Sequence, residues 1–476
     1  MVPAGMPVGG RWVEAASGAT MPVIDPGTEE VLAEVPDGTP ADGALAMDAA
    51  AGAQATWAAT GPRERGEILR RAFELMTERA DELALLITLE NGKPLSEARA
   101  EVLYAAEFFR WFGEEAVRVH GRYMRAPAGA ARLLVAKQPV GPCLLITPWN
   151  FPAAMATRKI GPAVAAGCTM VLKPAGETPL TALATAALLE EAGLPGGVLS
   201  VVTTSRSGAL TKPLFADPRL RKVSFTGSTE VGRLLLHHAA DQVLRTSMEL
   251  GGNAPFLVFE DADLDAAVGG ALLAKMRNVG EACTSANRFY VAAPVAEEFA
   301  GRLGERMGDM RVGHGAEPGT EVGPLINEAG RAKVEELVTD MVSRGARVVV
   351  GGAPIEGRGY FYRPTVVADV AEGSRALSEE IFGPVAPVIS FTDEASAVAW
   401  ANRTEYGLVA YLYTRDVGRA FRVAEALEAG MVGLNTGLVS NPAAPFGGVK
   451  QSGLGREGGF EGVEEFLETK YISVNW

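Results

Sequence analysis

Cysteine and histidine are scarce in this chain, which has three cysteines and four histidines among 476 residues. Three thiols cannot form the disulfide framework of a small secreted protein, so we expect a reducing compartment, the cytoplasm. His237 and His238 are adjacent, and no group of cysteine and histidine residues has the spacing of metal ligands. The sequence therefore predicts no metal site.

Basic charge and long apolar runs are also lacking. The formal net charge is −14 and the isoelectric point is near 5.0, which argues against binding to nucleic acid or to an anionic membrane surface. The longest uncharged run, Gln138 to Thr157, contains four prolines and an asparagine, so it does not predict a membrane span. The first residues lack the basic start and apolar core of a secretory signal. We expect neither a nucleic-acid partner nor a membrane partner.

The apolar pattern that is present changes along the chain. With 47% apolar residues the chain can bury a large core, and its length favours about two or three domains. Apolar residues recur every three or four positions over 64–87 and over 97–117, which predicts two amphipathic helices. Beyond Gly141 short apolar runs alternate with helical segments, and the alternation resumes after Cys283. Such alternation is typical of parallel sheets covered by helices, so we expect two α/β domains.

Only one of the three cysteines stands in a polar setting. Cys143 and Cys168 begin apolar runs that indicate buried strands, so we expect both to pack in a core. Cys283, in MRNVGEACTSANRFYV, is surrounded by glycine, acidic, hydroxyl and amide residues. This favours a loop between a helix and a strand, where reactive groups are often displayed. The stretch by itself leaves two interpretations open, a packing thiol and a functional one.

Two glycine-rich segments are candidates for binding the phosphates of a cofactor. GLGREG, at 453–458, fits the dinucleotide fingerprint as a string, but no apolar strand precedes it and only 18 residues follow, too few for a βαβ unit. In FTGSTEVG a strand-like run leads into Gly227, Ser228 and Gly232 at the start of a helix, where backbone N–H groups can face a pyrophosphate. An ordinary strand-to-helix turn explains this second segment equally well.

The motifs taken together resemble those of the aldehyde dehydrogenase superfamily. TPWNFP (147–152), FTGSTEVG, MELGG (248–252) and GEAC (280–283) stand in its order and spacing. EEIFGP (379–384) and PFGGVKQSGLGREGG (445–459) extend the match over essentially the whole chain. PWNFPAAMATRK, MRNVGEAC and GMVGLNTGLVS most resemble succinate-semialdehyde dehydrogenases. Two positions depart from the usual pattern: Glu281 stands where glutamine is usual, and Ser285 where a second cysteine is usual.

The resemblance implies an α/β fold of the aldehyde dehydrogenase type, with two Rossmann-like α/β domains and a small β oligomerisation arm. We expect the cofactor-binding domain at 1–123 and 142–250, and the catalytic domain at 251–440. The oligomerisation element is expected at 124–141 and 457–476, which contain the strand-like ARLLVAKQPV and YISVNW that fit neither domain. The resemblance further implies a homodimer or homotetramer.

The resemblance assigns three catalytic residues. The Cys283 thiolate would attack the aldehyde carbon, because covalent capture creates the tetrahedral carbon from which hydride leaves. The Asn150 side chain and the Cys283 backbone N–H would hold the oxyanion, a stabilisation worth about 3 to 4 kcal/mol per donor. Glu249 would take the proton of the water that attacks the thioester. Considered alone, Asn150 fits a turn residue and Glu249 a surface carboxylate.

A nicotinamide dinucleotide is the implied cofactor. Lys173 and Glu380 would reach its two riboses, and Phe382 would lie beside the nicotinamide. KPAGETP has Gly176 where NAD-preferring relatives carry an acid, and without that carboxylate a 2′-phosphate meets less repulsion. Because Glu177 is one position away, the sequence leans toward NADP without excluding NAD. The full set of cofactor-binding residues implied by the resemblance is Trp149, Lys173, Gly176, Gly227, Ser228, Leu250, Glu380 and Phe382.

Arg158, Arg277 and Ser440 match positions that bind the distal carboxylate of the substrate in succinate-semialdehyde dehydrogenases. Arginine suits this task because its planar fork grips a carboxylate through two N–H groups, although either arginine alone could pair with a surface acid. The hypothesis is NAD(P)-dependent oxidation of succinic semialdehyde to succinate through a cysteine thiohemiacetal and a thioester. The alternative is another small or ω-carboxylated aldehyde such as glutarate semialdehyde. A catalytically silent relative and a cysteine hydrolase are disfavoured, because all three catalytic residues are present and no histidine stands in a motif.

Overall fold

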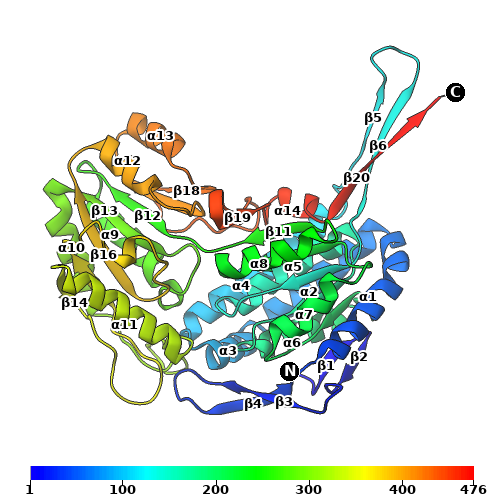
Figure 1. The fold of residues 1–476 in the computed structure, drawn as a ribbon, viewed down its shortest axis with the longest axis horizontal. Coiled ribbons are helices and arrows are strands. Elements are labelled where there is room, and N and C mark those ends of the chain that lie inside the picture. The colour runs from blue at the N-terminus through cyan, green and yellow to red at the C-terminus, as the bar shows by residue number, and fades with distance from the viewer. Residues whose placement is uncertain (1, 476) are drawn as a thin grey trace.

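The computed structural model describes residues 2–475 and contains two large sheets, each flanked by helices (Figure 1). The first sheet has the strand order β19-β11-β10-β7-β8-β9, and only β19 runs antiparallel to its neighbour. Side chains alternate between its faces, so Leu144 and Leu145 of β7 belong to different hydrophobic cores. The strands of this sheet are β7 (Cys143–Ile146), β8 (Met170–Lys173), β9 (Leu199–Val201), β10 (Lys222–Thr226), β11 (Arg245–Glu249) and β19 (Gly453–Leu454).

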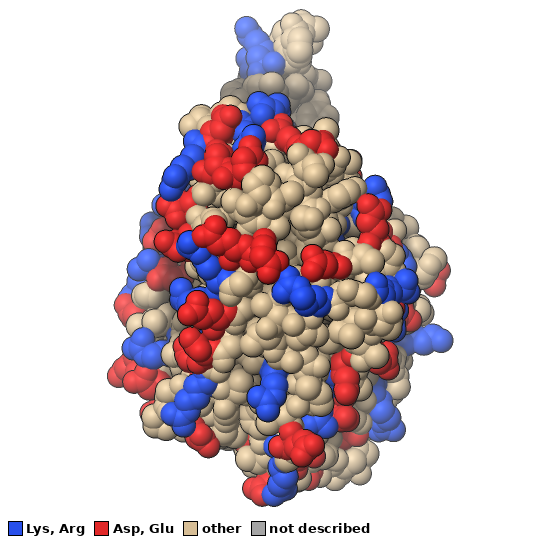
Figure 2. Space-filling model, turned by 90° about the vertical axis from the view of Figure 1, so that its left-hand side faces the viewer, with Lys and Arg blue, Asp and Glu red and all other residues tan. Residues whose placement is uncertain are grey.

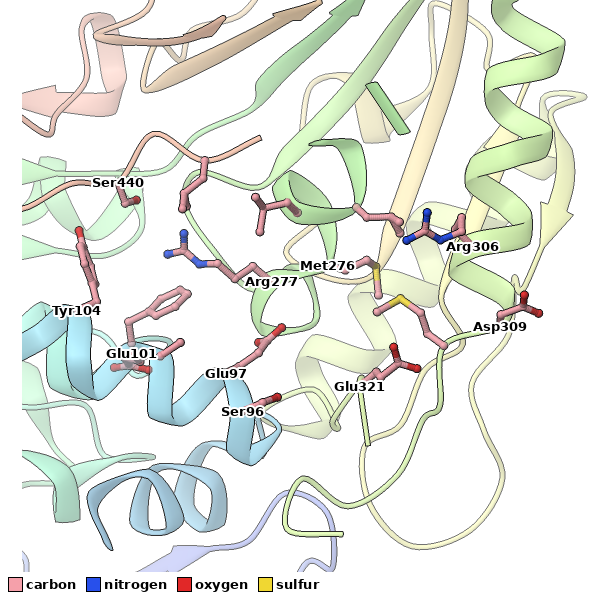
Figure 3. Close-up of a pocket in the computed structure, with 16 residues that line it drawn as sticks. Ser96, Glu97, Glu101, Tyr104, Met276, Arg277, Arg306, Asp309, Glu321 and Ser440 are labelled. Carbon is pink, nitrogen blue, oxygen red and sulfur yellow. The ribbon is translucent and has the colours of Figure 1, made fainter. Parts of the chain in front are cut away.

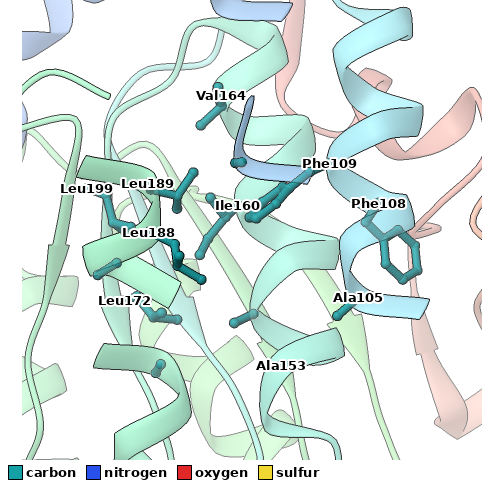
Figure 4. Packing of buried hydrophobic residues seen from close by; sticks show 14 of the residues in the cluster. Ala105, Phe108, Phe109, Ala153, Ile160, Val164, Leu172, Leu188, Leu189 and Leu199 are labelled. Carbon is teal, nitrogen blue, oxygen red and sulfur yellow. The ribbon is translucent and has the colours of Figure 1, made fainter. Parts of the chain in front are cut away.

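The helices that cover this sheet form two layers. One layer holds the core drawn in Figure 4, where Phe109 of α4 and Ile160 of α5 pack near Leu189 of α6. Cys143 and Cys168 belong to the same core and are fully buried, as the sequence predicts. The helices are α1 (Pro40–Ala59), α2 (Pro62–Glu78), α3 (Ala80–Asn91), α4 (Leu95–Glu115), α5 (Pro152–Ala166), α6 (Pro179–Glu191), α7 (Ser207–Phe215) and α8 (Thr229–Ala240).

The N-terminal region differs in part from the sequence prediction. The helical pattern over 64–87 forms two helices, because the backbone leaves helical geometry at Arg79, the residue between α2 and α3. Helix α1 was not expected, since its alanine-rich sequence has apolar residues on all sides. Four short strands precede it and form two hairpins: β1 (Met6–Val8), β2 (Arg11–Val13), β3 (Thr20–Ile24) and β4 (Val31–Pro36).

The second sheet has seven strands in the order β14-β15-β16-β13-β12-β17-β18, and only β14 is antiparallel to its neighbour. Its strands are β12 (Ala254–Val258), β13 (Ala286–Ala292), β14 (Arg347–Val350), β15 (Thr365–Ala368), β16 (Val385–Phe391), β17 (Val409–Tyr413) and β18 (Met431–Leu434). The helices around it are α9 (Leu264–Met276), α10 (Ala293–Gly308), α11 (Glu328–Ser343), α12 (Glu394–Asn402) and α13 (Val417–Ala426). The predicted pair of α/β units is confirmed.

A three-stranded antiparallel arm projects away from both sheets (Figure 1). It consists of β5 (Arg122–Arg125), β6 (Arg132–Pro139) and β20 (Leu467–Val474), with β6 in the middle. The two segments expected to form an arm therefore pair with each other, while β5 adds a strand that the sequence pattern did not reveal. The short helix α14 (Glu461–Glu464) precedes β20 and contacts α5.

The surface is mixed in charge on the face shown in Figure 2, where acidic and basic side chains alternate around uncharged areas. Many of these charges form exposed ion pairs, such as Arg302 with Asp265 and Arg347 with Glu297. Within residues 2–475, no helix combines the length and the apolarity that a membrane span needs.

Candidate active site

The catalytic candidates come from three connections at neighbouring edges of the two sheets. Asn150 lies in the turn between β7 and α5, Glu249 is the last residue of β11, and Cys283 lies between α9 and β13. Asn150 and Glu249 lie at the carboxyl ends of β7 and β11, at one edge of the first sheet, which is where α/β proteins place their ligands. Cys283 precedes β13 and lies at the amino end of this strand of the second sheet. A hydrogen bond from Asn150 to the loop of Cys283 joins the two edges.

The loop that carries Cys283 has an unusual backbone. Asn278, Val279 and Gly280 are consecutive residues in the left-handed region, with φ of 52°, 53° and 83°. This conformation is unfavourable for a β-branched residue such as Val279 and marks a segment that its surroundings must hold in place. A Cβ atom at Gly280 would lie 2.2 Å from the carbonyl oxygen of Gly383, so only glycine fits there.

Hydrogen bonds from outside the loop hold this conformation. The backbone N–H of Asn278 donates to the Glu97 carboxylate of α4 at 2.7 Å. The side-chain amide of Asn278 donates to the backbone carbonyls of Asn150 and Glu281, at 3.1 and 3.0 Å. The loop is thereby tied to the helical layer of the first sheet and to the turn that carries Asn150.

Asn150 faces the same loop. It is buried, and its Nδ2 donates to the backbone carbonyl of Glu281 at 3.0 Å. An amide nitrogen has two protons, so one N–H remains for a further acceptor. This arrangement suits the expected oxyanion donor, because the amide is oriented by the loop that also presents Cys283.

Cys283 is the most accessible of the three cysteines. Burial raises the pKa of its thiol to about 12, although the nearby charges of Arg158 and Arg277 lower it. A Cβ atom at Gly252 would lie 2.6 Å from the carbonyl oxygen of Cys283, which explains the glycine at the end of MELGG. Ser285 takes the position at which relatives carry a second cysteine, and its hydroxyl donates to the carbonyl of Lys275.

Glu249 is buried, and neither of its carboxyl oxygens has a hydrogen-bond partner in the described part of the chain. Burial and the nearby carboxylate of Glu457 raise its pKa well above the usual range, whereas Arg158 and Lys159 lower it. A buried carboxyl group with both oxygens free is available to accept a proton from water, as the expected general base must.

Arg158, the other expected substrate arginine, lies near Cys283 and Tyr104 and is paired with an acid. Its guanidinium forms an ion pair with Glu457 at 2.5 Å and lies 4.1 Å from the centre of the Phe446 ring. Lys159 pairs with the same carboxylate. The Glu457 carboxylate therefore neutralises the charge of Arg158, and Arg158 does not line the neighbouring cavity.

A cavity of about 660 Å³ opens between α4, α9, α10 and the segment around Ser440 (Figure 3). Arg277 and Ser440, two of the expected substrate residues, line it together with Tyr104. In Figure 3 the Arg277 guanidinium points toward Tyr104 and Ser440, away from Arg306 at the opposite end. The Arg277 guanidinium lies 4.7 Å from the centre of the ring of Phe151, the residue that follows Asn150.

Tyr104 is a residue that the sequence interpretation missed. Its hydroxyl oxygen is enclosed, and no residue within 2–475 meets hydrogen-bond geometry there, although Ser440 and Arg158 lie near enough to act on its pKa. Burial raises that pKa, while the charges of Arg158 and Arg277 lower it. No sequence motif marks Tyr104, because it lies on one face of an ordinary amphipathic helix.

A second cavity of about 430 Å³ lies beside the expected cofactor residues of the first sheet. Gly176 and Glu177 line it, together with hydroxyl groups that include Ser207. Lys173 donates to the Ser207 hydroxyl at 2.9 Å, and burial lowers the Lys173 pKa to about 8, while Glu177 opposes this shift. Ser228 caps the first turn of α8. Lys173, Gly176 and Ser228 thus lie at or just after the carboxyl ends of β8 and β10, at one edge of the sheet.

Further cofactor candidates are Trp149 and Leu250, which follow strands of the first sheet, and Glu380 and Phe382, which precede β16 of the second sheet. Phe382 has a left-handed backbone, and its ring lies edge-to-face with Trp149 at 5.5 Å between centres. The Glu380 carboxylate accepts a hydrogen bond from the Gly252 N–H at 3.2 Å, and burial raises its pKa to about 7. Leu250 packs against the position of Gly232 in α8. The contact between Trp149 and Phe382 thus connects a loop of the first sheet with a loop of the second.

The sequence model of the Aldehyde dehydrogenase family matches residues 12–472. The chain belongs to the aldehyde dehydrogenase family. A succinate-semialdehyde dehydrogenase of Paenarthrobacter nicotinovorans is 60% identical over 93% of this chain and 99% of its own length. A glutarate-semialdehyde dehydrogenase of Pseudomonas aeruginosa is 52% identical over 98% of this chain and 96% of its own length. A crystal structure described as an E. coli NADP-dependent enzyme has a TM-score of 0.98 and 50% identity, and covers 100% of this chain and 98% of its own.

The expected fold, an α/β architecture of the aldehyde dehydrogenase type, is confirmed by this structural match. The rejection of GLGREG as a phosphate loop also agrees with the structure. In this aldehyde dehydrogenase the segment contains β19 and the turn of Arg456, whose guanidinium donates to the carbonyls of Gly448 and Gly455. The segment pairs with the last residues of β11 as an antiparallel strand and does not form a strand-to-helix turn.

Proposed function

We propose that this aldehyde dehydrogenase oxidises succinic semialdehyde to succinate. The observation that carries the proposal is the cavity end at which Arg277, Ser440 and Tyr104 meet, beside the loop that presents Cys283. A cationic guanidinium with neighbouring hydroxyl groups is suited to the distal carboxylate of a short semialdehyde. The relative from Paenarthrobacter nicotinovorans, 60% identical, supports the same substrate.

In the proposed mechanism the Cys283 thiol gives its proton to a water molecule, and its sulfur bonds to the aldehyde carbon, so that the carbonyl electron pair moves to oxygen and a thiohemiacetal oxyanion forms. The Asn150 N–H that is left free by Glu281 donates to the resulting oxyanion, together with the backbone N–H of Cys283. Glu380 and Phe382 would help to hold the nicotinamide cofactor, which would supply the acceptor for the hydride. The thioester on Cys283 is then hydrolysed by a water whose proton passes to Glu249.

The residues at the cofactor cavity fit a dinucleotide. Outside the lining of this cavity the rings of Trp149 and Phe382 meet edge to face, Lys173 supplies a buried cation, and a Cβ atom at Gly176 would meet only the carbonyl of Thr204, at 3.7 Å. We propose NADP as the preferred cofactor, because Gly176 stands where an acid would repel a 2′-phosphate, although Glu177 also lines this cavity. The NADP-dependent enzyme of E. coli supports this preference.

Glutarate semialdehyde is the second candidate substrate. The cavity continues beyond Arg277 toward Arg306, which leaves space for a longer chain. The relative from Pseudomonas aeruginosa, 52% identical, supports this alternative.

We also propose that the chain is a homodimer or homotetramer joined through its arm. Tyr123 of β5 and Tyr471 of β20 are 63% and 58% exposed, and large exposed aromatic side chains on a projecting sheet favour an interface. The proposed division remains a cofactor-binding domain at 1–123 and 142–250, a catalytic domain at 251–440 and an oligomerisation element at 124–141 and 457–476.

The test is steady-state formation of NADPH and NADH with succinic semialdehyde, glutaric semialdehyde and butanal, for the native enzyme and for Arg277→Ala. Removing the guanidinium should lower kcat/KM for succinic semialdehyde by about 1.5 to 3 kcal/mol, or about tenfold to more than a hundredfold. Butanal, which has no carboxylate, should lose much less. Equal losses for the two substrates would show that Arg277 serves the loop rather than the carboxylate.

A further inference from the structure

Lys93 is a lysine enclosed in the protein beside the turn that carries Asn150. It follows the left-handed Gly92 at the end of α3, and 1% of its side chain is exposed. Its Nζ donates to the backbone carbonyl of Asn150 at 2.7 Å and lies 4.0 Å from the centre of the Phe151 ring. An ammonium group in such a place is costly unless it is fully paired, so its presence calls for an explanation.

Glu101 of α4 supplies the pairing charge. One carboxyl oxygen forms an ion pair with Lys93 at 2.5 Å, and the other accepts the N–H groups of Ala153 and Ala154 at 2.9 and 3.3 Å. These two N–H groups belong to the first turn of α5, where a helix favours a negative charge. Burial lowers the pKa of Lys93, whereas Glu101 raises it. The pair therefore fixes both sides of the turn between β7 and α5.

The carbonyl that Lys93 holds has a second donor. Asn278, in the left-handed part of the catalytic loop, donates to the same Asn150 carbonyl at 3.1 Å. The Asn150 amide in turn donates to Glu281 of that loop. Two donors therefore hold the Asn150 backbone carbonyl, and one hydrogen bond holds its side chain. We call Lys93, Glu101 and Asn278 the bracket, because together they set the direction of the remaining Asn150 N–H.

We infer that Lys93 is a positioning residue of the oxyanion site, which acts on the reaction only through Asn150. This rests on the function proposed for Asn150. A donor displaced slightly from the developing oxyanion loses most of its effect, so the bracket should control kcat more than aldehyde binding.

The test is a double-mutant cycle of Lys93→Met with Asn150→Ala, measured as kcat and KM with butanal and saturating cofactor. Butanal keeps the result independent of the semialdehyde assignment. Asn150→Ala alone should lower kcat about a hundredfold to a thousandfold, and Lys93→Met alone about tenfold to a hundredfold. In the Asn150→Ala background, Lys93→Met should have almost no further effect.

Lys222→Met is the matched control. Lys222 is equally buried, pairs with the Glu465 carboxylate and lies 5.0 Å from the centre of the Phe466 ring, but it has no contact with the Asn150 turn. Its effect on kcat should be unchanged by Asn150→Ala. If Lys93→Met does not fold, Glu101→Gln takes its place in the cycle, because it keeps an oxygen for α5 and removes the charge beside Lys93.

Two results would overturn the inference. Losses from Lys93→Met and Asn150→Ala that multiply in the double variant would show that Lys93 acts independently of Asn150. A native kcat in Asn150→Ala would remove the oxyanion role of Asn150 and the positioning role of Lys93 together. A failed semialdehyde proposal looks different, since it changes the preference of the native enzyme among aldehydes and leaves the cycle with butanal intact.

Discussion

The active centre contains two groups of buried polar side chains. In one group the side chains form ion pairs, and in the other they lack hydrogen-bond partners. In the paired part, Arg158 and Lys159 share the Glu457 carboxylate. In the unpaired part, Glu249 and the Tyr104 hydroxyl have no hydrogen-bond partner in the described chain.

Buried polar groups without partners are rare in folded proteins, because each lacks the hydrogen bonds that it had in water. The contrast therefore separates residues that hold the site from residues that meet the ligand. Substitutions in the paired part should act mainly on stability, and substitutions in the unpaired part mainly on catalysis.

The largest expected effect is in the unpaired part. Cys283→Ala should abolish aldehyde oxidation, because no other group can capture the aldehyde. Glu249→Gln should give a burst of reduced cofactor followed by slow turnover, since the thioester forms but its hydrolysis lacks a base. Rapid-mixing absorbance at the reduced-cofactor band measures both, with thermal unfolding as the control for folding. Full turnover by the Cys283 variant would contradict the assignment.

The pH dependence sharpens the same experiment. Burial raises the pKa of Glu249, so the carboxylate form needed to accept a proton accumulates only at a pH above the usual range of a glutamate. Hydrolysis of the acyl-enzyme should therefore accelerate as the pH rises through this raised pKa. The acceleration should disappear in Glu249→Gln. If the rate of hydrolysis still rises with pH in this variant, another group is responsible for the pH dependence.

The paired part is tested by Glu457→Ala, which should lower the free energy of unfolding by about 3 to 5 kcal/mol. Removing the carboxylate leaves the buried cations of Arg158 and Lys159 without a counter-charge. Urea unfolding at fixed protein concentration measures the change. Glu74→Ala is the control, because its ion pair with Arg70 is exposed and should contribute about 0 to 1 kcal/mol. Similar losses for both variants would erase the distinction between buried and exposed pairs.

The smallest expected effect separates two tyrosines. The hydroxyls of Tyr104 and Tyr362 are both enclosed without a hydrogen-bond partner among the described residues, but only Tyr104 lines the substrate cavity. Tyr104→Phe and Tyr362→Phe should each leave stability within about 1 kcal/mol of native, because no hydrogen bond is lost. Only Tyr104→Phe should raise KM for succinic semialdehyde relative to butanal, by a few-fold. A parallel change in Tyr362→Phe would mean that the effect reports packing alone.

Much of the fold followed from local pattern. Alternating strands and helices after Gly141 gave two α/β units, and the strand-like segments 131–140 and 471–476 indicated an arm. The helix break at Arg79 and the strand β5 escaped, because a continuous apolar period and an exposed hairpin carry no distinctive sequence signal. Helix α1 escaped for the opposite reason, since its alanines give no preferred face.

By itself the sequence determined the chemical inventory: a thiol in a polar loop, an amide in PWN, a carboxylate in MELGG and the glycines that only close packing explains. These features are local, so they are legible as motifs. Only the tertiary structure decided how the inventory is divided. It paired Arg158 with Glu457, left Arg277 facing a cavity, and placed Lys93 and Asn278 on one carbonyl of Asn150. Partners and burial depend on residues far apart in the chain, and the free energy of a charged group is set by those surroundings rather than by its neighbours in sequence.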